Sequence, residues 1–200
     1  MATDSITIGN LALAKIGSIR VASFDDASQP ARYLKLFFEQ TRDEVLRAHD
    51  WNFASKRATL AALATAPEFG WGYQYQLPID CLMVRQLNAW ESHEQRGLFE
   101  IEGKVLLTDA DSAQIRYTSQ VLDSSQFDPI FVEALATRLA SKICQPLTGS
   151  RQQGLEYLSD FNAQIGQLAM QKDAAEARGK RKLPWVESDL VRRRFVSDIV

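Results

Sequence analysis

RDEVLRAHDWNFASKRATL, residues 42–60, is the stretch that decides how this chain folds. Its first half continues a helical pattern in which apolar residues recur every three or four positions. The chain then runs without a spacer into Trp51 and Phe53 and alternates in the manner of a strand. Because these two aromatic side chains join a helix to a strand and can bury large areas, we interpret them as core anchors rather than as a ligand-stacking pair. The stretch predicts a helix attached to the edge of a β-sheet.

Helical periodicity recurs on both sides of this stretch. The segments with an apolar stripe at helical spacing, and therefore the predicted helices, are residues 5–17, 30–48, 128–146 and 150–177. Ser28 and Asp128 are typical N-cap residues, and a proline follows each of them at an early helical position. Pro146 is expected to end the third helix.

The pattern between the second and third helices has a period of two, which is typical of strands. The predicted strands are residues 55–60, 73–77, 82–88 and 112–119, and FEIEGKVLL at residues 99–107 predicts a hairpin with Gly103 in its turn. We therefore expect an α+β fold. It is mainly a helical bundle with a small antiparallel β-sheet, residues 54–120, inserted in the middle. A folded body of residues 1–177 is then followed by an extended C-terminal arm, residues 178–200.

The composition is typical of one domain with an arm. The chain has 200 residues, of which 46% are hydrophobic, so it can bury a core without a disulfide or metal staple. Cys81 and Cys144 lie far apart in the sequence and are expected to be reduced thiols. The first residues lack the pattern of a secretory signal, and no apolar run is long enough to span a membrane. These features predict a soluble protein made in the cytoplasm.

Charge is distributed unevenly along the chain. The net charge is −2, yet residues 178–200 carry seven Lys/Arg against three Asp/Glu, which leaves the remainder acidic. A solvated tail, nucleic-acid contact and docking on a protein partner are all compatible with a basic arm. Docking is favoured because Trp and Arg are the residues that dominate protein interfaces. The residues expected to bind partners are Trp90 in the β region and, in the arm, Arg178, Lys180, Arg181, Lys182, Trp185, Arg192, Arg193, Arg194 and Phe195.

The sequence offers little that resembles a catalytic site. His49 falls at a helix end and His93 in a polar loop, so both are interpreted as ordinary surface positions. The closest carboxylate pairs, residues 25–26 and residues 109 and 111, fall in predicted turns, where Asp is common for backbone reasons. Phosphate-binding loops, a nucleophile elbow and metal-ligand spacings do not occur in the sequence. No catalytic, cofactor-binding or metal-binding residue is therefore predicted, and the chain is expected not to be an enzyme.

Several segments, in a fixed order, resemble one protein family. They are NLALAKIG near the N-terminus, RDEVLRAHDWNFASKRATLAAL, YQYQLPIDCLMVRQL, the hairpin FEIEGKVLLTD and FDPIFVEALATRLASKICQPLTGS. Together they span residues 5–175. In this order and spacing the chain resembles the head-to-tail adaptors of short-tailed bacteriophages, the tail tubular protein A family.

The resemblance implies a structural role in the virion. Members of the family form a ring, usually a dodecamer, below the portal at the tail vertex. They receive the tail nozzle, a tail tubular protein B-like component, on the other side. The genome passes through the lumen during DNA ejection without being read, and no catalysis is required. C-terminal segments in such adaptors commonly reach toward the portal protein.

Two other functions remain open from the residues. One is a tail-associated peptidoglycan hydrolase that uses carboxylates, for which Asp109 and Asp111 would be the candidates. The other is a DNA-binding module that uses the basic arm, which would lose affinity steeply as salt rises.

Overall fold

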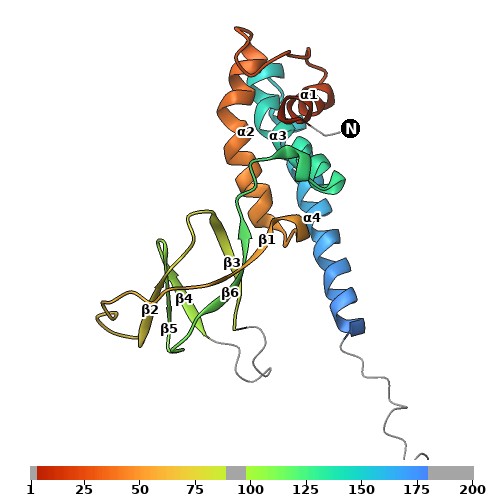
Figure 1. The fold of residues 1–200 in the computed structure, drawn as a ribbon. Coiled ribbons are helices and arrows are strands. Elements are labelled where there is room, and N and C mark those ends of the chain that lie inside the picture. Colours follow the sequence, from red (N-terminus) through yellow and green to blue (C-terminus); the bar gives the residue numbers. More distant parts are fainter. Residues whose placement is uncertain (1–3, 89–97, 180–200) are drawn as a thin grey trace, which may run out of the picture. The chain divides into compact units, whose positions relative to one another are not determined.

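The structure, a computed structural model, describes residues 4–88 and 98–179, with the side chains of these ranges as far as residue 171. The chain divides into two compact units, residues 1–165 and 166–200. The predicted α+β fold is confirmed (Figure 1). The helices are α1 (Ser5–Lys15), α2 (Gln29–Ala48), α3 (Pro129–Thr148) and α4 (Arg151–Gly179), with short 3-10 turns η1 (Asn52–Ala54) and η3 (Ser124–Gln126). The strands are β1 (Ser55–Thr59), β2 (Tyr73–Gln76), β3 (Cys81–Leu87), β4 (Phe99–Glu102), β5 (Val105–Thr108) and β6 (Gln114–Ser119).

The two predicted N-caps begin their helices as expected. The Ser28 hydroxyl accepts a hydrogen bond from the Ala31 N–H at 3.4 Å, before α2. The Asp128 carboxylate accepts one from the Ile130 N–H at 2.8 Å, before α3. Each satisfies a backbone donor that has no partner inside the helix.

The end of α3 differs from the prediction. The helix does not stop at Pro146 but continues to Thr148. Proline costs little here because, in the final turn, it removes a single backbone hydrogen bond near the helix end. The stop comes from Gly149, which has a φ of 76° and donates its N–H to the Gln145 carbonyl at 2.9 Å. A left-handed glycine just beyond the last turn is the usual helix terminator.

Helices α1, α2 and α3 pack together as a bundle (Figure 1). Its interior includes fully buried aliphatic side chains, among them Leu13, Leu34 and Leu135. The first turns of α4 lie directly on α3, because a Cβ added at Gly154 would come within 3.1 Å of the Ser141 carbonyl oxygen. The glycine that weakens the helical pattern of α4 is therefore what permits this close approach.

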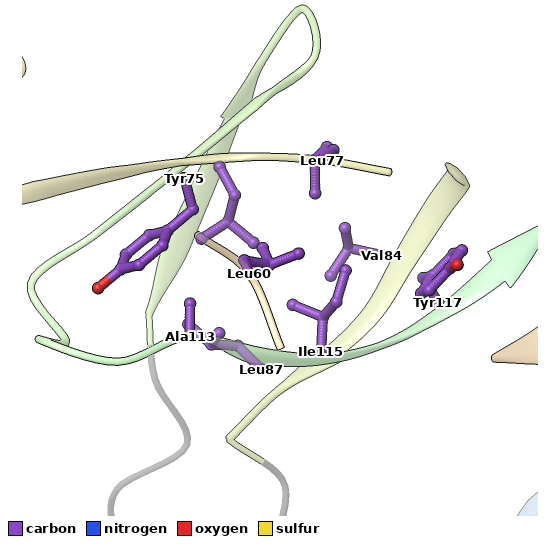
Figure 2. Close-up of a cluster of buried hydrophobic side chains, with 9 residues drawn as sticks. Leu60, Tyr75, Leu77, Val84, Leu87, Ala113, Ile115 and Tyr117 are labelled. Carbon is purple, nitrogen blue, oxygen red and sulfur yellow. The ribbon is translucent and has the colours of Figure 1, made fainter. Parts of the chain in front are cut away.

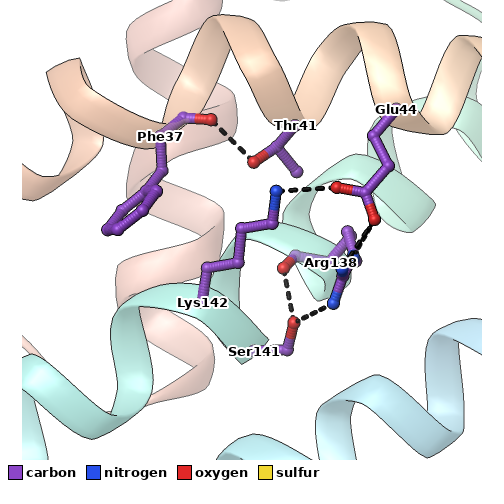
Figure 3. Close-up of polar contacts among 6 residues, drawn as sticks. All are labelled: Phe37, Thr41, Glu44, Arg138, Ser141 and Lys142. Atoms are coloured by element: carbon purple, nitrogen blue, oxygen red, sulfur yellow. Dashed lines mark hydrogen bonds and ion pairs between the residues drawn. The ribbon is translucent and has the colours of Figure 1, made fainter.

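A charge cluster ties α2 to α3 (Figure 3). The Glu44 carboxylate on α2 accepts hydrogen bonds from Arg138 Nε at 2.7 Å and Lys142 Nζ at 2.6 Å, both on α3. Arg138 is held in turn by Ser141, whose hydroxyl accepts from Nη1 at 3.1 Å. Burial of the carboxyl acts to raise the pKa of Glu44, but the hydrogen bonds from Lys142 and Arg138 outweigh it and the pKa is lowered.

We expect this cluster to stabilise the fold only when Glu44 is ionised. Because the pKa in the folded chain lies below its ordinary value of 4.5, the contribution is fully present above pH 4.5 and is lost as pH falls through the folded pKa. The Glu44 side chain is 38% exposed, so solvent screening limits the contribution to about 0.5–1 kcal/mol. Urea unfolding at pH 7 and at a pH well below 4.5 should show Glu44→Gln less stable than wild type at pH 7 and closer to it in stability at the lower pH. A difference of the same size at both pH values would contradict the assignment.

The aromatic anchors pack against the core, with Trp51 buried and Phe53 half-buried. Trp51 is 5% exposed and donates its indole N–H to the Val45 carbonyl of α2 at 2.9 Å. Both rings pack edge-on against Phe131 of α3, with centroid distances of 5.2 Å and 5.1 Å. Phe127 completes the cluster at 4.8 Å from Phe131. The chain therefore enters the β region from a fixed point on the helical core.

The β region consists of two three-stranded antiparallel sheets rather than one. The first sheet has the strand order β1-β6-β3, and the second sheet has the order β2-β5-β4. Strands β4 and β5 form the predicted hairpin, whose two turn residues are Gly103, with a φ of 60°, and Lys104. A positive φ at the first turn position followed by an ordinary residue is the arrangement of a type II′ turn.

The two sheets share one apolar core (Figure 2). Tyr75 and Leu106 contribute to it from the second sheet, and Val84 and Ile115 from the first. The Tyr75 hydroxyl donates a hydrogen bond to the Ala110 carbonyl at 2.8 Å, so the polar end of this buried side chain has a partner. The complete cluster is Leu60, Tyr75, Leu77, Val84, Leu87, Leu106, Ala113, Ile115 and Tyr117.

Arg85 of β3 joins the β region to the end of α2. Its Nη2 donates to the carbonyls of Arg47 at 3.1 Å and His49 at 2.8 Å, and its Nε donates to the Thr118 hydroxyl at 2.8 Å. A cation at the C-terminus of a helix is favoured by the helix dipole and satisfies carbonyls that have no partner within the helix.

Candidate partner-binding site

The partner-binding residues predicted from the sequence fall outside the part of the chain that can be described. Trp90 lies in residues 89–97, and the residues from Lys180 to Phe195 lie in 180–200. Arg178 lies in the last turn of α4, beyond the residues whose side chains are described. The surfaces described below, which could contact a partner, are formed by described residues of the first unit.

Two of the four predicted turn carboxylates, Asp26 and Asp109, accept backbone hydrogen bonds. Asp26 accepts hydrogen bonds from the backbone N–H groups of Ala22 at 2.8 Å and Ser23 at 3.2 Å. Asp109 accepts the Gly72 N–H at 2.9 Å. These contacts give both carboxylates a structural role in their turns. Of the candidate histidines, His93 falls outside the described residues, whereas His49 packs its ring against Trp51.

Neither a metal site nor a membrane span is found within the described ranges. Residues 4–88 and 98–171 contain no group of three His, Cys, Asp or Glu side chains that could hold a metal ion. No helix in the described part of the chain is long and apolar enough to cross a bilayer. Cys81 and Cys144 are free thiols, the first half-buried and the second buried.

A groove of about 440 Å³ lies on the outer face of the first sheet, the face that carries Arg57 and Arg116. We call it the arginine groove. It is lined by Arg57, Ala58, Thr59, Gln86, Gln114, Ile115 and Arg116. Strand register explains why the polar members meet: Arg57 on β1 lies opposite Arg116 on β6, and Arg116 lies opposite Gln86 on β3. Residues directly opposite one another point to the same face of a sheet.

The two arginines of the groove differ in their partners. Arg116 pairs with Asp50 at 2.9 Å and donates from Nε to the Gln86 side-chain oxygen at 3.1 Å. Arg57 is exposed, and its side chain forms no ion pair with any residue described in the structure. Because Asp50 already balances Arg116, the groove presents the positive charge of Arg57 beside amide and hydroxyl groups. Such a surface suits a carboxylate or a phosphate.

Two helices of the first unit also expose apolar side chains among the residues that the structure describes. On α2, Leu36 is 65% exposed, and the half-buried rings of Tyr33 and Phe37 lie one turn apart on the same helix. On α4, Leu155 is 49% exposed and Leu158 is half-buried. Apolar side chains that gather on one helix face are typical of contact surfaces.

The arginine groove was not predicted from the sequence. The alternation of SKRAT in β1 indicates that Arg57 and Thr59 share a face. It does not reveal that β6 and then β3 lie beside β1, which is what brings Arg116 and Gln86 to Arg57. The signal that could have found the site is the lack of an acidic neighbour for Arg57 within its own strand.

The chain matches no protein-family model and no curated protein sequence.

Proposed function

We propose that the chain is a structural head-to-tail adaptor of a short-tailed bacteriophage. In this role, copies of the chain form a ring, a dodecamer by the resemblance, that joins the portal protein to the tail nozzle. DNA passes through the lumen without sequence-specific contact. The chain would be made in the host cytoplasm and would reside in the virion, below the portal vertex.

The observation that carries the proposal is the pair of exposed apolar faces on α2 and α4. A ring is built from heterologous contacts, in which one patch of each subunit meets a different patch of the next. The face at Leu36 and the face at Leu155 are two such patches on different helices.

Charge supports a passage through which DNA can slide. Residues 1–177 carry sixteen Lys/Arg against twenty-two Asp/Glu, so the body is acidic. An acidic wall repels the phosphate backbone, whereas a basic wall would retain DNA by releasing counterions. This favours a channel subunit over a DNA-binding module.

The proposal predicts that Leu36→Asp prevents assembly without unfolding the chain. Leu36 is largely exposed, so the substitution should change the free energy of unfolding by about 0.5 kcal/mol or less. Placed in an apolar contact between copies, however, the carboxylate would be buried without a partner. Mass photometry of the chain mixed with the portal protein of the same phage should show a large complex for wild type and only free subunits for Leu36→Asp.

Leu122→Asp provides the matched control, because Leu122 is 66% exposed and lies on neither α2 nor α4. This variant should assemble as wild type does. Assembly of Leu36→Asp at the wild-type level would remove the α2 face from the ring contact, and wild-type chains that never associate with the portal would contradict the function.

A further inference from the structure

The structure points to a second contact between copies, made by two strand edges of opposite charge. We propose that β1 of one copy and β4 of the next pair as parallel strands, with Arg57 beside Glu100. This inference rests on the proposed function, because a ring needs two different surfaces that fit each other. It adds to that function a defined pair of edges, an orientation and one ion pair.

Both strands lie at the edge of their sheets. The first sheet begins with β1 and the second sheet ends with β4. An edge strand presents backbone N–H and C=O groups that can pair with another chain. The opposite edge of the second sheet is partly covered, because Ala62 bridges to Tyr75 of β2 and Leu63 donates its N–H to the Gln74 carbonyl at 2.9 Å.

The backbone groups that β1 offers can be identified from its ladder with β6. Leu60 donates its N–H to the Ala113 carbonyl at 2.8 Å, so this pair is hydrogen-bonded. In an antiparallel ladder such pairs alternate with pairs that do not exchange hydrogen bonds. Ala58 and Lys56 therefore turn their backbone groups toward β6, whereas Arg57 and Thr59 turn theirs toward the open edge.

The same reasoning applies to β4. Leu77 donates its N–H to the Lys104 carbonyl at 3.0 Å, so this pair is hydrogen-bonded. By alternation, Leu106 and Thr108 turn their backbone groups toward β2, and Val105 and Leu107 turn theirs toward β4. On β4, Glu100 lies opposite Leu107 and Glu102 lies opposite Val105, so the backbone groups of both glutamates point toward β5. Phe99 and Ile101 consequently turn their backbone groups outward.

The side chains at the two edges carry complementary charges. Glu100 and Glu102 are exposed, and neither forms an ion pair with a residue in the described ranges. Glu100 accepts only the indole N–H of Trp71, at 3.2 Å, among the described side chains. Arg57 on β1, at the edge of the first sheet, is a cation that could pair with such a glutamate. Opposite charges on neighbouring strands favour pairing, and like charges oppose it.

The orientation follows from which groups face outward. In a parallel pair, Arg57 would exchange hydrogen bonds with the backbone of Phe99 and Ile101, which places its side chain beside that of Glu100. Ala58 would then lie beside Ile101. The polar face of β1, which carries Arg57, would then continue into the face of the next copy's β4 that carries the glutamates. The opposite faces, which carry Ala58 and Ile101, would also lie side by side.

An antiparallel pair would mismatch these faces. It would set Arg57 beside an apolar residue of β4, and it would bring the glutamates to the side of Lys56. Lys56 already pairs with Asp80 at 2.7 Å on that side. Parallel pairing is therefore the arrangement that both the free charges and the sheet faces favour.

Charge reversal tests the contact in the full chain. Arg57→Glu and Glu100→Arg should each raise the dissociation constant between copies about tenfold, because each sets like charges side by side. The double variant, Arg57→Glu with Glu100→Arg, restores the pair in reverse and should recover most of the lost affinity. Arg20→Glu is the matched control at an exposed arginine outside α2, α4, β1 and β4, and it should leave association unchanged. Mass photometry over a concentration series gives these constants.

Ile101→Pro tests the backbone part of the contact. It removes an N–H that faces the open edge, where proline is tolerated, and keeps the ladder between β4 and β5. The variant should keep the wild-type circular dichroism spectrum and associate about tenfold more weakly.

The outcomes separate this inference from the proposed function. Assembly with the portal that is unaffected by Arg57→Glu, or a double variant no better than its parents, overturns the strand pairing and leaves the adaptor function standing. Loss of duplex DNA binding on Arg57→Glu, with association between copies unchanged, would make the groove a phosphate site and also overturns it. Wild-type chains that stay monomeric with the portal present overturn both.

Discussion

Replacing Phe131 with alanine should lower the free energy of unfolding by about 3–5 kcal/mol, the largest effect that we expect of a single substitution in this chain. The ring is fully buried at the point where α3 meets the chain entering the β region. It lies edge-on to Trp51, Phe53 and Phe127, with centroid distances between 4.8 Å and 5.2 Å. Alanine would remove all three contacts and leave a cavity among rings that are each fixed by other neighbours.

Urea unfolding followed by circular dichroism measures this loss. Phe131→Leu keeps much of the apolar volume and should cost about 1–2 kcal/mol, mainly from the lost ring contacts. Phe69→Ala makes the same chemical change at a side chain that is 86% exposed and should cost about 0.5 kcal/mol or less. Equal losses at residues 131 and 69 would show that the aromatic cluster does not hold the helices to the β region.

Replacing Arg85 with methionine should cost about 2–4 kcal/mol. The guanidinium holds the carbonyls of Arg47 and His49 and the hydroxyl of Thr118. Thr118 is fully buried, and charged hydrogen bonds of this kind each contribute about 1.5–3 kcal/mol. Burial lowers the pKa of Arg85, and the nearby carboxylate of Asp50 acts against that change.

The lysine variant separates charge from geometry at this position. Arg85→Lys keeps a cation near the helix end but cannot reach Thr118 and both carbonyls with one ammonium group, so we expect about half of the methionine loss. Arg32→Met removes an exposed arginine elsewhere on the protein and serves as the control for the loss of positive charge. An Arg85→Met variant as stable as Arg32→Met in urea would refute the role of Arg85 in joining α2 to β3.

The elements of the fold were largely predictable because their signals are local. The caps at Ser28 and Asp128, the apolar stripes and the turn at Gly103 depend on residues a few positions apart. The end of α3 was predicted wrongly because proline in a last turn is tolerated, whereas Gly149, three residues later, supplies the stop.

The candidate site was not predictable, for a related reason. The arginine groove and the contacts of Arg85 depend on β6 lying between β1 and β3, and on β3 reaching the end of α2. Periodicity shows which residues share a face within one strand, but it carries no information on which strands become neighbours. The two strands of the first sheet that bring Arg57 and Arg116 together are separated by the whole second sheet in the sequence.

Electron microscopy of the chain mixed with the portal protein of its phage tests the central claim most directly. The account predicts closed rings of this chain seated on one end of the portal, with the lumens of the two rings aligned. Portals that stay bare in the presence of excess chain, while the chain is shown to be folded by circular dichroism, would contradict it.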